Sequence, residues 1–200
     1  MKEYRVLRKE AGQKWEEVPF LEVCEQPWFF VPGIEMSAQL MWDAGNLYVH
    51  QVAAEKHIRC TFTEPLSPVC EDSCMEFFLS PKPDDERYFN FEINPYGAMM
   101  LGFGRGRSDR IRLLAKNPTE YFAIKTKVGK EKWEVFYKIP SSFFEVFFPG
   151  FSLEKGLNLK ANFYKCGDKT EQPHYLTWNK VTSLKPDYHR PSDFGLIRLA

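Results

Sequence analysis

Three features are missing from this sequence of 200 residues: a net charge, a long apolar run and a paired-cysteine motif. Lysine plus arginine and aspartate plus glutamate each number 27, so no overall field attracts nucleic acid or an anionic membrane. No run of 18 apolar residues occurs, which excludes a helix that spans a bilayer. We therefore expect neither a nucleic-acid partner nor a membrane partner.

The cysteines are few and form no recognisable framework. Their number is odd and no CxxC pair occurs among Cys24, Cys60, Cys70, Cys74 and Cys166. The charged start MKEYRVLRKE lacks the apolar segment of a secretory signal, so we expect a cytoplasmic chain, or a secreted one if a signal peptide precedes this sequence. The spacing of Cys70 and Cys74 matches no common zinc pattern. Buried, unreactive thiols and no metal site are the prediction.

Aromatic residues are plentiful, at 16% of the chain, which is typical of β structure. Apolar residues alternate with polar ones in many short segments separated by turn residues. Eight or more strands and at most one or two short helices, one of them over residues 141–148 with a serine N-cap, predict an all-β fold. We expect an antiparallel β-sandwich of the jelly-roll or immunoglobulin-like kind, forming one domain over residues 1–200. Residues 1–36, which contain several prolines, are expected to pack on it as an irregular segment.

The stretch from Glu71 to Arg107 predicts two strands joined by the turn-rich link SPKPDDER. Successive side chains of a strand point to opposite faces, so apolar residues two apart predict a buried face. That face comprises Met75, Phe77, Leu79, Phe89, Phe91 and Ile93. The other face of the second strand carries Tyr88, Asn90, Glu92 and Asn94. Such hydrogen-bonding groups suit a hydroxylated ligand, so we interpret this face as a candidate site, with ordinary surface as the alternative.

Two further patterns suggest chemistry. GFGRGR, residues 102–107, lacks the Lys-Ser/Thr and following helix of a phosphate-binding loop, so we expect a connection between strands. Asp72, Glu76 and Glu92 could include the carboxylate pair of a glycosidase, although hydrogen bonding without catalysis is the simpler interpretation. Trp178 is either a core residue, since Leu176 shares its face, or a platform on which a sugar ring stacks.

Several segments in order resemble the carbohydrate-binding family 9-like domains. They are DSCMEFF at 72–78, YFNFEINPYG at 88–97, ANFYKCGD at 161–168, HYLTWN at 174–179 and HRPSDFGLIRL at 189–199. The likeness covers residues from about 37 to the C-terminus and is greatest to stand-alone members of about this length. It implies a β-sandwich that binds the ends of glucans or xylans, or small sugars, without catalysis.

The resemblance also implies a set of site residues. Trp178 looks like the second of two tryptophans that enclose the sugar. Glu76 looks like the glutamate that follows the DS pair, and Asn162 corresponds most nearly to an amide on a late strand. Cys70 occupies the position of the first tryptophan, and a basic residue of the family's site falls near Glu92. The family's modules hold structural calcium, but no dense Asp/Asn/Gly loop here resembles a calcium site.

The leading hypothesis is a non-catalytic carbohydrate-binding domain. A mono- or oligosaccharide, held at its chain end, would stack on Trp178 and hydrogen-bond to Glu76, Glu92, Asn94 and Asn162, with Tyr96 as a substitute aromatic. The first alternative is a glycoside hydrolase that uses Glu76 and Glu92. The second is a protein-interaction domain whose sugar site has degenerated, which the cysteine at position 70 suggests.

Overall fold

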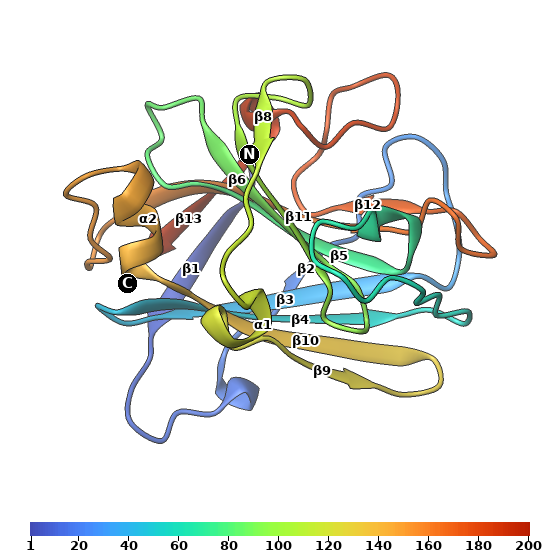
Figure 1. Cartoon of the computed structure of the whole chain (residues 1–200), viewed down its shortest axis with the longest axis horizontal. Helices are drawn as coiled ribbons and strands as arrows, with labels where there is room; N and C mark the ends of the chain where they lie inside the picture. The colour runs from blue at the N-terminus through green and yellow to red at the C-terminus, as the bar shows by residue number, and fades with distance from the viewer.

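The computed structural model describes residues 1–200 as thirteen strands and two short α-helices. The strands hydrogen-bond in one continuous sheet in the order β8-β7-β6-β5-β11-β13-β1-β3-β4-β10-β9, with β12 beside β11 and β2 beside β3. The sheet curls over, so that a layer with β5, β6 and β11 faces a layer with β3, β4 and β10 (Figure 1). Neither helix has the length and apolar character needed to cross a membrane.

The boundaries of the elements follow the alternating pattern of the sequence closely in the central region. The strands are β1 Glu3–Arg8, β2 Leu21–Glu22, β3 Glu35–Trp42, β4 Asn46–Ala54, β5 Cys74–Ser80, β6 Tyr88–Ile93, β7 Met99–Gly104, β8 Arg110–Arg112, β9 Lys125–Val128, β10 Lys132–Pro140, β11 Asn158–Cys166, β12 Tyr175–Thr177 and β13 Gly195–Leu199. The helices are α1 Pro118–Tyr121 and α2 Ser141–Phe147. The predicted hairpin β5–β6 is present and antiparallel, and β3–β4 and β9–β10 form two further antiparallel hairpins.

The prediction of an all-β fold is confirmed, but a purely antiparallel sandwich is not. Strand β1 pairs in parallel with β13 through residues 3–6 and with β3 through residues 7–8, which makes the sheet mixed. The expectation that residues 1–36 are irregular holds for most of this segment but not for residues 3–8, which form the same strand β1. Its backbone groups fill the gap between the two halves of the sheet, so this segment joins the layers instead of lying across them.

The short helix at residues 141–148 is present as α2, although its capping differs from the prediction. The N-cap residue is Pro140, and no side chain caps the helix. The four-residue helix α1 was not predicted; it has Pro118 at its start, where the missing N–H of proline is tolerated. Both helices are too short to stabilise themselves and depend on packing. Phe143 and Phe144 of α2 are buried in the core between the layers.

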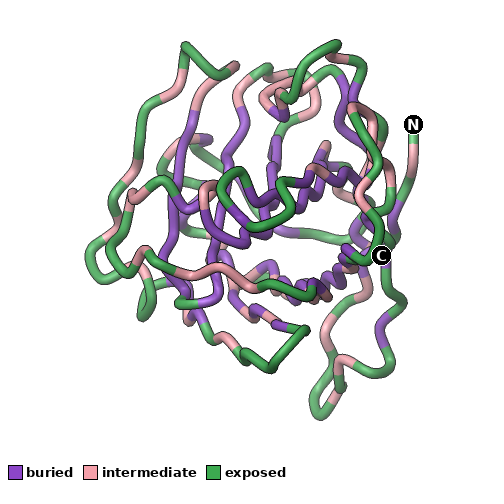
Figure 2. Tube along the Cα trace, turned by 90° about the vertical axis from the view of Figure 1, so that its right-hand side faces the viewer, coloured by how far each residue is buried: buried purple, intermediate pink, exposed green.

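The strands β5 and β6 are buried on both faces. Their apolar face lies in a core of 39 residues between the layers, as predicted. In Figure 2 the buried residues gather in the interior of the molecule, and the loops around them are largely exposed. Their other face meets a second cluster of 11 residues, to which Val181, Tyr188 and Phe194 contribute from the segment before β13. This covering segment explains why the polar side chains of β6 are buried instead of solvated. Buried polar groups require partners, so their contacts identify the site.

A buried ion pair connects the two layers. Lys165 of β11 is fully buried, and its Nζ lies 3.0 Å from Oε1 of Glu55, the residue after β4. The Glu55 carboxylate also accepts hydrogen bonds from Trp133 Nε1 (2.7 Å) and Ser73 Oγ (2.8 Å). Burial alone would raise the pKa of Glu55, but the charge of Lys165 and these two donors hold it below the ordinary value. The Glu55 carboxylate is therefore ionised at neutral pH, and its hydrogen bonds are made within the fold.

We expect Lys165→Met to destabilise the fold by about 3–5 kcal/mol, because it leaves the Glu55 carboxylate buried without its counter-ion. Adding Glu55→Gln should restore part of the loss by removing the unpaired charge. Urea denaturation of the single and double variants measures both effects, with the exposed Lys125→Met as the matched control. A loss no larger than that of the control would contradict the importance of the pair.

Candidate functional site

A cavity of about 150 Å³ opens on the polar face of the β5–β6 hairpin. It is lined by Cys70, Glu76, Glu92, Arg107, Arg110, Cys166, Asp168, Tyr175, Pro186, Asp187, Tyr188 and His189. Four carboxylates and two guanidinium groups in so small a space make the lining strongly polar. The volume is below the roughly 300–1,000 Å³ of pockets that enclose drug-sized ligands, so the cavity suits a ligand no larger than one small polar ring.

Two carboxyl groups form the floor of the cavity. The register of β5 and β6 places Glu76 directly opposite Glu92, and such cross-strand neighbours have Cβ atoms about 4.5–5.5 Å apart. Glu92 Oε1 accepts a hydrogen bond from Asn90 Nδ2 (2.8 Å), and Arg110 Nη1 lies 3.5 Å away. The single side-chain hydrogen bond of Glu76 comes from the Cys166 thiol (2.9 Å). A thiol is a weak donor, so Glu76 retains unused hydrogen-bonding capacity in the cavity.

The two carboxyl groups differ in their electrostatic surroundings. Burial raises the pKa of Glu76 well above its ordinary value, and the neighbouring Glu92 raises it further. Burial also raises the pKa of Glu92, but the Arg110 guanidinium opposes that rise. Glu76 is therefore the group that more readily holds a proton, and it can donate as well as accept a hydrogen bond.

A histidine fixes the position of Arg110. The Arg110 Nη1 atom lies 2.8 Å from His189 Nε2, and Tyr88 Oη lies 2.8 Å from His189 Nδ1. The same Nη1 atom lies 3.3 Å from His189 Nδ1, and because a guanidinium can only donate, the neutral ring accepts from it, with the shorter contact at Nε2. Burial, followed by the charges of Arg110 and Arg107, lowers the pKa of His189 to about 2. The imidazole thus remains neutral and holds the guanidinium at the cavity wall.

Gly102, the first glycine of the sequence GFG, leaves the space that the Asn90 side chain occupies. Gly102 of β7 lies directly opposite Asn90 of β6, and a methyl group at position 102 would collide with the Asn90 side-chain amide. Without a Cβ there, the amide bends along the strand toward Glu92. The predicted connection at residues 102–107 therefore begins as a strand, and its close approach to Asn90 shapes the floor of the cavity.

The rim of the cavity carries a partly exposed aromatic residue. Tyr175 of β12 is supported edge-on by Trp28 and Phe29, at centroid distances of 5.8 Å and 5.7 Å. Burial, and then the charge of Asp168, raise the pKa of Tyr175 to about 12, so its phenol is neutral. Burial likewise raises the pKa of Asp168 and of the Cys70 thiol. One aromatic ring, carboxyl groups and a guanidinium therefore surround the opening.

The family model for carbohydrate-binding family 9 matches residues 11–199. This chain belongs to carbohydrate-binding family 9. The resemblance found in the sequence segments is thereby confirmed, and it extends further toward the N-terminus than the quoted segments. None of the curated proteins compared with the chain matches it.

Solved structures of related proteins share the fold of this family 9 chain. A candidate carbohydrate-binding protein from Bacteroides uniformis ATCC 8492 superposes with a TM-score of 0.85 at 27% identity, covering 100% of this chain and 99% of that one. A family 9 module from Caldicellulosiruptor kristjanssonii, in complex with glucose, gives a TM-score of 0.70 at 15% identity and coverages of 100% and 96%. The same kind of module in complex with cellotriose gives 0.70 at 16% identity, with coverages of 99% and 93%.

Of the expected site residues, only Glu76 and Glu92 line the cavity of this family 9 domain. The Asn94 amide donates to Phe62 O and to Asp72 Oδ2, and its oxygen accepts from two backbone N–H groups. Asn162 bonds the backbone at Asn179 and Phe163 in the same manner. Both amides are buried and engaged with the chain itself, so they hold loops in place.

The expected aromatic residues lie elsewhere. Trp178 is 3% exposed and packs in the central core against Phe163, which is contrary to the expected stacking role. The physical reason is the face that it shares with Leu176, since that face points between the layers. Tyr96 is 63% exposed and lies at a different hollow, beside Lys130 and Glu171.

Sequence reasoning missed Tyr175, Arg110, His189 and Asp168. Tyr175 could have been found, because side chains alternate along a strand. If Leu176 and Trp178 point into the core, Tyr175 points to the opposite face. Arg110 begins β8 and His189 lies in the loop before β13, 79 residues further along the chain, and nothing in their spacing indicates that they meet.

The donors gathered at the cavity do not fit calcium. The group of potential metal ligands that lie close together is Cys74, Glu76 and Cys166. Calcium takes six to eight oxygen ligands, whereas two of these three donors are sulfur. The structural calcium of the family therefore has no counterpart in this group.

We expect Glu76→Gln to raise the melting temperature at neutral pH. The folded-state pKa of Glu76 is raised, so the unfolded chain loses this proton first and stability falls as pH rises above about 4.5. Glutamine removes that penalty, and the gain should vanish near pH 4, where glutamate is protonated in both states. Thermal unfolding at several pH values measures it, with the exposed Glu145→Gln as control. A pH-independent difference would show that ionisation of Glu76 is not its cause.

Proposed function

We propose that this domain binds a sugar in the cavity between Glu76, Arg110 and Tyr175 and does not cleave it. The observation that carries the proposal is the pair of adjacent buried carboxyl groups, Glu76 and Glu92, beside an arginine and a partly exposed aromatic ring. Neighbouring hydroxyls of a pyranose offer donors and acceptors at matching short intervals, while its C–H face packs on an aromatic ring.

Membership in the family supports a carbohydrate ligand. Related modules with the same fold have been solved with glucose and with cellotriose. The small volume favours a single terminal sugar residue, with the remainder of any chain outside the cavity. Tyr175 would provide the stacking surface, Glu76 and Glu92 would accept from hydroxyls, and Arg110 would donate.

The arrangement of the carboxyl groups favours binding over hydrolysis. A glycosidase needs two carboxyl groups that flank the scissile bond, one of them protonated and the other ionised. Glu76 and Glu92 are next to one another on adjacent strands of one sheet, so both approach a bound ring from the same side. That geometry suits hydrogen bonds to adjacent hydroxyls.

Calorimetric titration with glucose, cellobiose, xylobiose and mannose tests the proposal. We expect a saturable isotherm for at least one sugar and a loss of tenfold or more in affinity for Tyr175→Ala, because the stacking surface is removed. The control is Tyr96→Ala, which removes an exposed aromatic ring that is not among the residues lining the cavity. In contrast, Trp178→Ala should cost about 3–5 kcal/mol of stability, because it empties part of the core.

Three outcomes would overturn the proposal. Unchanged sugar affinity in Tyr175→Ala would place the binding surface elsewhere. Release of aryl alcohol from aryl glycosides, abolished by Glu92→Gln, would identify a hydrolase. If the folded protein gives no heat with any sugar, the interpretation as a protein-interaction domain replaces it.

A further inference from the structure

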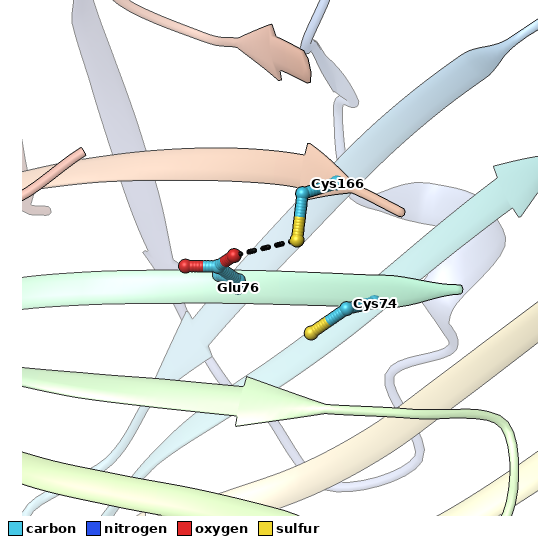
Figure 3. A group of neighbouring side chains, drawn as sticks. All are labelled: Cys74, Glu76 and Cys166. Carbon is cyan, nitrogen blue, oxygen red and sulfur yellow. Dashed lines mark hydrogen bonds between the residues drawn. The ribbon is translucent and has the colours of Figure 1, made fainter. Parts of the chain in front are cut away.

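We propose that Cys74, Glu76 and Cys166 form a binding site for a thiophilic divalent metal ion of the zinc type, at the floor of the cavity. One ligand atom from each residue, two Sγ and one carboxylate oxygen, all lie within 4.8 Å of one another. The three side chains converge from two neighbouring strands, as Figure 3 shows, and all three are buried. This site is distinct from a sugar site in its chemistry, although the two share Glu76.

The sheet itself brings the ligands together. Cys74 and Glu76 are two residues apart in β5, so their side chains share one face. Cys166 is the direct partner of Cys74 in the antiparallel β11–β5 pair, which places the two thiols side by side. Strand positions are held by backbone hydrogen bonds on both sides, and such rigid elements give more precise sites than loops.

The spacing of the three atoms is close to that of a zinc site. In a tetrahedral site with Zn–S distances of about 2.3 Å, two sulfur ligands lie about 3.8 Å apart. The separations here are at most 4.8 Å, so adjustments of about 1 Å in the side chains complete the geometry. Cys166 and Glu76 also line the cavity, which provides the path by which an ion enters.

The donor set selects the class of metal. Thiolates favour zinc, cadmium and copper(I), whereas calcium and magnesium take oxygen ligands. Binding of one divalent ion converts both thiols to thiolates and engages Glu76 as a carboxylate, so the two thiol protons and any proton held by Glu76 are released to solvent. The fourth position faces the cavity, whose wall also carries the Cys70 thiol.

Glu76 has a reason to accept a cation. It is buried opposite Glu92, and its one side-chain hydrogen bond comes from Cys166, a ligand of the proposed site. A divalent ion would replace that weak bond and oppose the repulsion between the two carboxylates. The remaining charge would be balanced in part by Arg110, which lies beside Glu92.

Titration of the reduced, metal-free protein with Cd²⁺ tests the site, because cadmium–thiolate bonds give an ultraviolet charge-transfer absorption that unbound cadmium lacks. We expect one ion per chain, an absorption equivalent to two thiolates, and displacement by Zn²⁺. Cys74→Ser and Cys166→Ser should each halve the absorption and weaken binding at least tenfold, which is about 1.4 kcal/mol. The matched control is Cys24→Ser, which removes an exposed thiol.

The unmodified chain keeps the test informative if a buried serine prevents folding. A one-to-one saturation with the intensity of two thiolates supports the site, and its absence overturns it. Loss of the signal in Cys24→Ser would assign the ion to the surface. Failure of the reduced protein to bind Cd²⁺, with a Cys74–Cys166 disulfide in the oxidised protein by mass spectrometry, would make this a redox pair instead.

A consequence for ligand binding follows, and it rests on the proposed function. Because Glu76 belongs to both sites, saturation with Zn²⁺ should weaken sugar binding by tenfold or more, while Cys24→Ser leaves this competition intact. The two proposals fail separately. If the protein binds Cd²⁺ through two thiolates but binds no sugar, the metal-site proposal stands and the proposed function fails. If it binds sugar but shows no thiolate absorption with Cd²⁺, the metal-site proposal fails and the proposed function stands.

Discussion

The interior ion pair of Lys165 and Glu55 is the interaction on which the arrangement of the two layers depends. Apolar packing between curled halves of a sheet has little directional preference, but a buried charge must meet its partner at one distance and angle. Four elements meet at this pair, because Glu55 follows β4, Trp133 lies in β10, Ser73 precedes β5 and Lys165 lies in β11. The layers are therefore fixed in register as well as held together.

The same network reaches the rim of the cavity. Lys165 Nζ donates to His174 Nε2 at 2.7 Å, and burial followed by the charge of Lys165 lowers the pKa of His174 to about 4. The other ring nitrogen of this neutral histidine then donates to Gln172 O at 2.7 Å. Tyr175 directly follows His174 in the chain. The hydrogen bond from Lys165 to His174 therefore links the position of the rim aromatic to the ion pair in the core. One connected network of hydrogen bonds and charges thus extends from the core to the rim of the cavity.

The central hairpin could be predicted from the sequence because its signal is local. Alternation over six residues determines which side chains share a face, and the turn determines the pairing that puts Glu76 opposite Glu92. The parallel pairing of β1 has no such signal, since it depends on residues nearly the whole chain apart. For the same reason the spacing of cysteines revealed nothing, because Cys74 and Cys166 meet across strands.

The misplacement of the stacking residue has a different origin. Both a core tryptophan and a binding tryptophan are aromatic residues in a strand, so composition does not separate them. The face of the strand does, because Leu176 and Trp178 point one way and Tyr175 the other. Resemblance to a family therefore predicts the type of residue in a site more reliably than the position of that residue in the chain.

The parallel pairing of β1 with β13 also bears on how the chain is made. Glu3 pairs with Leu196 and Val6 with Leu199, so β1 cannot complete this pairing until β13 has been synthesised. At synthesis rates of about 5–20 residues per second, that wait is roughly 10–40 s. Throughout it, residues 3–6 of β1 lack their β13 partner, and β11 has an open edge from its own synthesis until β13 follows. Closure of this sheet therefore has to follow synthesis of β13, and until then the unpaired strand edges can hydrogen-bond with other chains.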